Sequence, residues 1–226
     1  MAFVEIKKEN IQVTSYLVGL HSFRKDHNYG NYKANLINDI QSLLNLNFDT
    51  LKIGGLDILK VGLEESFEIR LTPNTIIYQD KLSFEELTSN AKEILNIWLK
   101  HSPNVKLSLI GFVTNFDITL DKLTETNRFR LKEQYFKNFR IGKKLKGIDF
   151  RFNYLLNYKG HDYNVHLSML EKDDKDYIFQ GTVDFNETTE NKISGLQKES
   201  CDRVFSAAKE YFENELFQFF NLKEDK

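Results

Sequence analysis

The stretch of residues 148–170, IDFRFNYLLNYKGHDYNVHLSML, decides the fold class of this chain. Apolar and polar residues alternate on both sides of Lys159-Gly160, a dipeptide typical of a tight hairpin turn. A third run of strand character, residues 177–185, follows a charged loop at residues 171–176. Three successive strands joined by short turns form an antiparallel meander.

The sequence upstream of the meander predicts further strands and helices. Strands are expected at residues 11–20, at 50–61 around Gly54-Gly55, at 67–71 and 75–79, and over 105–120. A helix with an apolar face is predicted to include residues 36–44. Another begins at Ser83, because Ser83 and Glu86 have the spacing of a capping box. Residues 128–139 and 200–221 complete the set of expected helices.

These elements predict an α+β protein with antiparallel sheet, packed helices and a long C-terminal helix. Each half reads as strand, helix, strands and helix, which divides the chain into residues 1–102 and 103–226. The length of 226 residues is compatible with two intimately packed halves or with one large domain. The similarity of the two halves rests on element order, since no sequence period accompanies it.

Composition predicts an ordinary globular protein of a reducing compartment. Hydrophobic residues make up 41% of the chain and charged residues 28%, and the formal net charge is −2. The single cysteine, Cys201, excludes an intrachain disulfide, and its helical spacing from apolar neighbours predicts a buried residue. The N-terminus lacks the pattern of a signal peptide, and no apolar run is long enough to span a bilayer. We therefore expect a cytoplasmic protein that does not use a membrane.

The second half resembles an uncharacterised, sporadically distributed bacterial protein family. The resemblance is carried by IGFVTNFDITL at residues 110–120, by Gln134-Tyr135-Phe136 and by the meander segment at residues 182–185. The C-terminal helix with Phe205 and Phe212 completes it. The resemblance implies a bacterial source and an α+β fold, and it implies no activity.

The loop at residues 21–32 is the first candidate for function. Long loops in compact domains often carry function, and this one combines cationic and aromatic residues that suit stacking on bases or peptide side chains. An alternative is a surface loop pinned by Phe23 and Tyr32. The candidate residues are His21, Phe23, Arg24, Lys25, His27 and Tyr29.

A basic segment at residues 128–146 is the second candidate. It has the charge to contact phosphates, although its aromatic residues have the spacing of a helix core with a solvated basic side. Its candidate residues are Arg128, Arg130, Lys132, Lys137, Arg140, Lys143 and Lys144.

The meander supplies the third candidate, because strand alternation puts its polar residues on common faces. If the registers of the three strands agree, one sheet face is polar throughout. That face is either a ligand pocket under the C-terminal helix or a plain solvent face. The candidate ligand-binding residues are Arg151, Asn153, Asp162, Asn164, His166 and Gln180.

No catalytic motif, phosphate-binding loop or zinc-ligand spacing occurs in the sequence, so no catalytic residue, cofactor or metal is predicted. The leading hypothesis is a non-enzymatic binding or scaffold protein that acts through protein contacts, including self-association. The 13% of aromatic residues motivates it, since aromatic side chains are enriched in interfaces. The alternatives are a small-ligand binder with a pocket between the meander and the C-terminal helix, and a nucleic-acid binder that uses the basic segment and the loop from His21. A hydrolase or nuclease stays open as well, since some enzyme families scatter their site residues widely along the chain.

Overall fold

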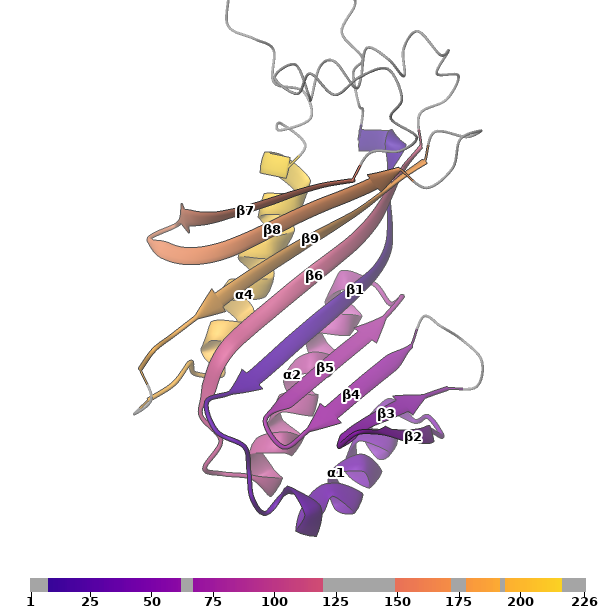
Figure 1. The fold of residues 1–226 in the computed structure, drawn as a ribbon, viewed down its shortest axis with the longest axis vertical. Coiled ribbons are helices and arrows are strands. Elements are labelled where there is room, and N and C mark those ends of the chain that lie inside the picture. The colour runs from indigo at the N-terminus through magenta and orange to yellow at the C-terminus, as the bar shows by residue number, and fades with distance from the viewer. Residues whose placement is uncertain (1–7, 62–66, 120–148, 172–177, 192–193, 217–226) are drawn as a thin grey trace, which may run out of the picture.

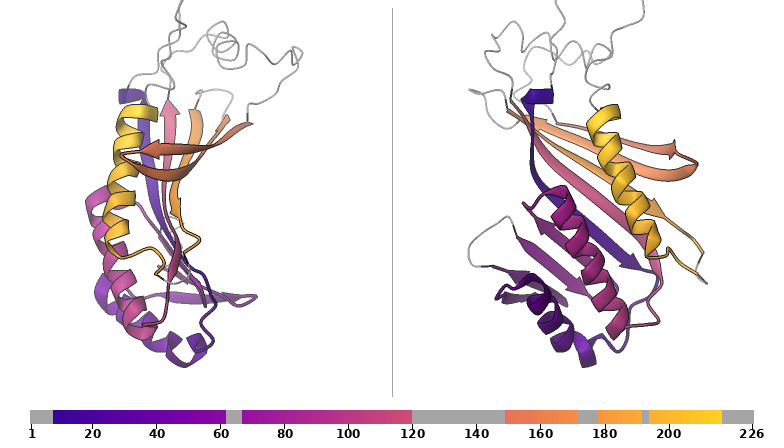
Figure 2. Two further views of the ribbon diagram at one scale, coloured as in Figure 1. Left: turned by 90° about the vertical axis from the view of Figure 1, so that its left-hand side faces the viewer. Right: turned by 180° about the vertical axis from the view of Figure 1, so that it is seen from behind.

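The computed structural model describes residues 8–61, 67–119, 149–171, 178–191 and 194–216. The described strands form one nine-stranded antiparallel sheet in the order β2-β3-β4-β5-β1-β6-β9-β8-β7 (Figure 1). The three described α-helices pack on one face of this sheet, here called the helix face (Figure 2). The described residues leave the other face, the open face, uncovered. The predicted α+β class with antiparallel sheet is confirmed.

The first half supplies five strands and two helices. After a 3-10 turn at Lys8–Asn10, the elements are β1 (Ile11–Ser22), α1 (Tyr29–Leu44), β2 (Asp49–Ile53), β3 (Leu56–Lys60), β4 (Glu68–Thr72), β5 (Thr75–Asp80) and α2 (Phe84–His101). Ser83 caps α2 in the predicted capping box, in which its side chain and that of Glu86 each accept a backbone N–H of the other. Gly54 and Gly55 close the β2–β3 hairpin with positive φ angles of 55° and 89°.

The second half supplies four strands and one described helix. These elements are β6 (Leu107–Thr119), β7 (Asp149–Tyr158), β8 (His161–Glu171), β9 (Ile178–Thr188) and α4 (Glu199–Glu210), which a π-helical turn (Tyr211–Leu216) extends. The meander is confirmed, and Lys159 and Gly160 make its first turn with φ angles of 52° and 80°. The helix predicted at residues 128–139 lies outside the described residues.

Strands β1 and β6 join the two halves at the centre of the sheet. They pair antiparallel along almost their whole length, from Ile11 opposite Ile118 to Ser22 opposite Leu107. The predicted boundary between residues 102 and 103 falls in the loop from α2 to β6. The sheet is continuous across this boundary, and a repeat relation between the halves stays a prediction.

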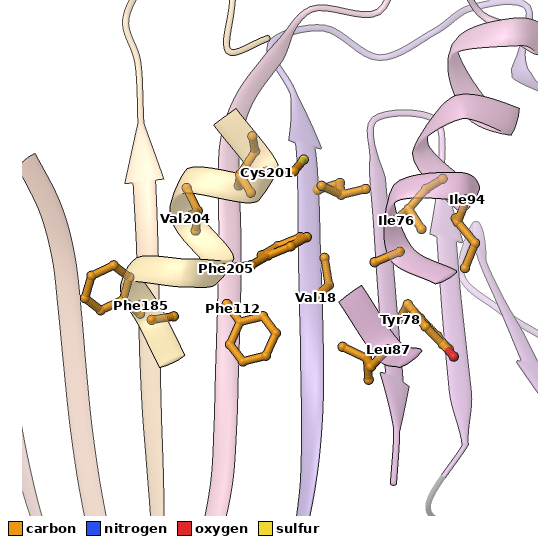
Figure 3. Close-up of a cluster of buried hydrophobic side chains, with 14 of the residues drawn as sticks. Val18, Ile76, Tyr78, Leu87, Ile94, Phe112, Phe185, Cys201, Val204 and Phe205 are labelled. Atoms are coloured by element: carbon orange, nitrogen blue, oxygen red, sulfur yellow. The ribbon is translucent and has the colours of Figure 1, made fainter. Parts of the chain in front are cut away.

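The core lies between the helix face and the helices (Figure 3). Phe112 of β6 is 1% exposed and stands where α2 and α4 meet, with ring centroids 5.2 Å from Phe84 and 5.6 Å from Phe205. Cys201 of α4 is buried as predicted, and burial raises the pKa of its thiol to about 12. That thiol is therefore a packing group. Most described aromatic rings belong to this core.

A glycine on the helix face tests this packing. Gly181 of β9 lies opposite Phe116 of β6, and a Cβ at Gly181 would overlap the Phe116 ring. Phe116 is fully buried, so the ring has little room to move. We expect Gly181→Ala to lower the free energy of unfolding by about 1–3 kcal/mol in urea denaturation.

The matched control is Gly111→Ala on the open face, where a Cβ would meet its nearest atoms at 3.5 Å, an ordinary contact. This variant should stay within about 1 kcal/mol of the wild type. Equal losses in the two variants would contradict the packing of Phe116 over Gly181.

Candidate functional site: a basic pocket beside helix α1

A pocket of about 400 Å³ lies between two loops that are far apart in the sequence. One loop, residues 22–28, joins β1 to α1, and the other, residues 101–106, joins α2 to β6. The two loops meet because β1 ends where its antiparallel neighbour β6 begins, at the lower end of the sheet in Figure 1. Their backbones are joined directly, since the Phe23 N–H donates to the Lys106 carbonyl at 3.1 Å.

Asp26 fixes the shape of the first loop and ties it to the second. Its carboxylate accepts hydrogen bonds from the Ser102 hydroxyl, from the Tyr32 hydroxyl at 2.9 Å and from the Asn28 N–H at 2.8 Å. Burial opposes ionisation of Asp26. The hydrogen bonds from Ser102, Asn28 and Tyr32 outweigh it and hold the pKa of Asp26 below its ordinary value. Asp26 is thus an ionised anchor.

A second contact holds α1 against the end of α2 beside the pocket. The rings of Tyr32 and His101 stack with centroids 5.8 Å apart and planes 9° apart. His101 Nε2 lies 3.0 Å from Asp39 Oδ2, which also accepts from Lys100 at 3.0 Å. Hydrogen bonds from Lys100 and His101 lower the pKa of Asp39. These contacts fix the position of His101 on the pocket wall.

Three cations stand among the thirteen residues that line the pocket. Arg24, Lys25 and Lys106 are exposed side chains on its wall, and none of them pairs with an acid among the described residues. His27 and His101 line the same hollow. Asp26 is the only acid among the lining residues, and its oxygens are already taken by hydrogen bonds. Three cations and one carboxylate leave net positive charge at this concave surface.

The start of α1 lies beside this pocket. Asn28, the residue before the helix, lines the pocket and makes no side-chain capping bond to the first turn, which contains no acidic residue. The backbone N–H groups of Asn28 and Tyr29 donate to Asp26, and that of Asn31 donates to the Asn28 carbonyl. The contribution of this helix start to the pocket is therefore the positive end of its dipole. Phe23, Pro103 and Val105 give the wall an apolar part.

Of the six residues predicted from the first loop, four line the pocket and two do not. Phe23, Arg24, Lys25 and His27 line the pocket. Tyr29 is 7% exposed, and its hydroxyl donates to Asp57 at 3.3 Å beneath α1, so its role is in packing.

His21 also lies away from the pocket, on the open face of the sheet. Its Nδ1 is 3.1 Å from Thr75 Oγ1. Burial lowers the pKa of His21, and the nearby charge of Asp184 opposes that shift.

Sequence reasoning missed the second wall of the pocket. This wall consists of His101, the last residue of α2, and of the short loop that follows it, with Ser102, Asn104 and Lys106. Nothing in the sequence of that loop marks it as part of a site. The Pro103-Asn104 pair indicates a turn, but its position beside the first loop depends on the register of β1 against β6. That register was not available from the sequence.

The registers of the three meander strands agree as predicted, but the face that carries the candidate residues is not polar throughout, because the exposed Leu155 and Leu170 lie on it too. Asn153 lies opposite His166, which lies opposite Asp184, and Arg151, Ser168 and Thr182 form the next row. Asn164, opposite Asn186, and Asp162, which accepts a hydrogen bond from Asn157 at 2.8 Å, belong to the same face. Alternation also places Gln180 there.

Helix α4 packs on the opposite face of the meander. The ring of Phe185 lies 5.6 Å from that of Tyr211, and Arg203 forms an ion pair with Glu187 at 2.8 Å. The expectation of a pocket between the polar face and the C-terminal helix is therefore corrected, because strand alternation turns the polar side chains away from that helix.

The basic segment, with all its candidate residues, lies outside the described residues. Within the described part of the chain, no group of three or more His, Cys, Asp or Glu side chains is placed to hold a metal ion. No described helix has the length and apolar character needed to cross a membrane.

Comparison with known proteins assigns no family to this chain. No family model matches the chain, and no curated protein matches it either. The resemblance to a bacterial family stays a prediction. The basic pocket is therefore interpreted from its own chemistry.

The anchoring role of Asp26 gives a pH-dependent prediction. Because the pKa of Asp26 is lowered in the folded state, its ionised form stabilises the fold above its ordinary value of 3.8. We expect Asp26→Asn to lower the free energy of unfolding at neutral pH by about 1–3 kcal/mol, since hydrogen bonds to a charged acceptor are lost. The difference should shrink as the pH falls below 3.8 and wild-type Asp26 becomes protonated.

Chemical denaturation at a series of pH values measures this difference. Glu190→Gln is the control, since Glu190 is exposed and makes no hydrogen bond or ion pair among the described residues. A difference between Asp26→Asn and wild type that is independent of pH would contradict the anchoring role.

Proposed function

We propose that this protein is a binding protein whose basic pocket takes a phosphorylated small molecule. The single observation that carries the proposal is the set Arg24, Lys25 and Lys106 around one hollow, unpaired among the described residues. A hollow lined by charges of one sign raises the local concentration of ions of the opposite sign. Lysine and arginine side chains beside a helix N-terminus suit a phosphate group.

The size and lining of the pocket support a small organic ligand. Its volume of about 400 Å³ lies within the usual range of ligand pockets. Phe23 and Pro103 offer an apolar surface for the body of a ligand whose phosphate faces the cations. The proposed ligand is therefore a phosphate ester with an apolar or ring-containing body.

The hydrogen bonds of the pocket favour binding over catalysis. The Ser102 hydroxyl donates a hydrogen bond to Asp26, while His101 Nε2 contacts Asp39. Ser102 and His101 thus form no nucleophile–base pair with each other. These polar groups hold the loops in place, and Arg24, Lys25 and Lys106 have no acidic partner among the described residues.

Isothermal titration calorimetry with inorganic phosphate, adenosine monophosphate and adenosine tests the proposal. We expect the monophosphate to bind, inorganic phosphate to bind more weakly, and adenosine not to bind. Arg24→Ala and Lys106→Ala should each weaken binding of the monophosphate about tenfold, because each removes a charge-assisted contact. Binding should also weaken as the salt concentration rises.

Lys81→Ala is the matched control, an exposed lysine at the far end of β5 from the pocket. It should bind as the wild type does. Equal binding of adenosine and its monophosphate would contradict a phosphate site. Binding only to oligonucleotides, with affinity that grows with their length, would favour the nucleic-acid alternative.

A further inference from the structure

Two histidines, His27 and His101, line the basic pocket together with its three permanent cations. An imidazole gains its proton between about pH 8 and pH 5, a range in which lysine and arginine stay charged. With both imidazoles neutral, three cations and one carboxylate leave the lining with a net charge of +2. Each proton that an imidazole takes up adds one further positive charge. The charge of the pocket therefore depends on pH.

His101 is held in place more firmly than His27. The Tyr32 ring stacks on the His101 ring with centroids 5.8 Å apart, and Asp39 Oδ2 lies 3.0 Å from His101 Nε2. The His101 side chain is 14% exposed. His27 is an exposed residue that makes no hydrogen bond or ion pair with the described residues. A ring that is already fixed loses little conformational entropy when it contacts a ligand, which favours His101 as the responsive group.

Asp39 sets the protonation pattern of the His101 ring. Hydrogen bonds from Lys100 and His101 lower the pKa of Asp39, so its carboxylate is ionised at neutral pH. An ionised carboxylate only accepts hydrogen bonds, so Nε2 of the neutral His101 ring carries the proton. Nδ1 is then the atom that gains the second proton. The carboxylate of Asp39 stabilises the imidazolium that forms.

The other charged or titratable groups near His101 come from the two helices and the two loops around it. Those of α1 and α2 are Tyr32, Asp39 and Lys100, and those of the loops are Arg24, Lys25, Asp26, His27 and Lys106. The pKa values of Asp26 and Asp39 are lowered, and burial raises that of Tyr32, so these three keep their charge states near neutral pH. Lysine and arginine stay protonated there. A change in the charge of the lining between pH 6 and pH 8 is therefore a change at its imidazoles.

We propose that His101 takes up a proton when the basic pocket binds a phosphate group, so that the affinity for this anion rises as the pH falls. This inference rests on the proposed function, because it concerns the same pocket. The imidazolium attracts the anion, and the bound anion stabilises the imidazolium to the same extent. Since the anion favours the protonated ring, the gain in affinity is present at pH 6 and is lost toward pH 8.

Isothermal titration calorimetry with sulfate at pH 6 and pH 8, at constant ionic strength, tests this coupling. Sulfate keeps its charge in this range, whereas a phosphate ester has a second pKa of about 6. We expect sulfate to bind about tenfold more tightly at pH 6. His101→Gln keeps a donor for Asp39 but cannot take up a proton, so the ratio should fall to about threefold or less. His161→Gln, at an exposed histidine that does not line the pocket, is the matched control and should keep the wild-type ratio.

A measurement on the wild type does not depend on the folding of a variant. At pH 7, addition of sulfate should move the nuclear magnetic resonance signals of the His101 ring toward those of an imidazolium, while the His161 signals stay in place. Unmoved His101 signals, or a ratio that His101→Gln leaves unchanged, would overturn the inference. If adenosine monophosphate binds while sulfate binds equally at both pH values or not at all, this inference alone fails. If neither anion binds, the proposed function fails with it.

Discussion

The antiparallel pairing of β1 with β6 is the constraint on which the rest of the structure depends. It joins five strands of the first half to four of the second in one sheet. It also brings the loop after β1 beside the loop before β6, and this juxtaposition creates the basic pocket. The sheet register brings the two loops together, and the hydrogen bond from Ser102 to Asp26 then ties one loop to the other.

The two faces of the sheet differ in what they carry. The helix face holds the core, where Phe112 contacts residues of both α2 and α4. Ion pairs from Lys92 to Asp202 at 2.8 Å and from Lys209 to Glu85 at 2.6 Å join the same two helices at the surface. Exposed pairs of this kind contribute little free energy, so apolar burial is what holds the helices together. The open face then carries the polar meander residues at one end and the exposed Leu51 and Ile53 of β2 at the other.

The residues around the pocket fall into two sets, those that hold the loops together and the cations that line the hollow. Asp26, Tyr32 and Ser102 satisfy one another and hold the two loops together. Arg24, Lys25 and Lys106 are held by the same loops but find no acid among the described residues. The ionised Asp26 offsets part of this charge, and three cations against one carboxylate leave the lining with net positive charge.

Local sequence signals determined the elements of this protein. Alternation gave the meander strands, Ser83 with Glu86 gave the start of α2, and Gly54-Gly55 and Lys159-Gly160 gave two hairpins, because each depends on residues close in the chain. The face of the meander that carries its polar residues was also predictable, since strand alternation has a fixed period. Only the tertiary structure decided which face α4 covers, that His21 and Tyr29 leave the pocket, and that residues 101–106 complete it. Those outcomes depend on the pairing of strands that are about ninety residues apart, and no local pattern encodes that register.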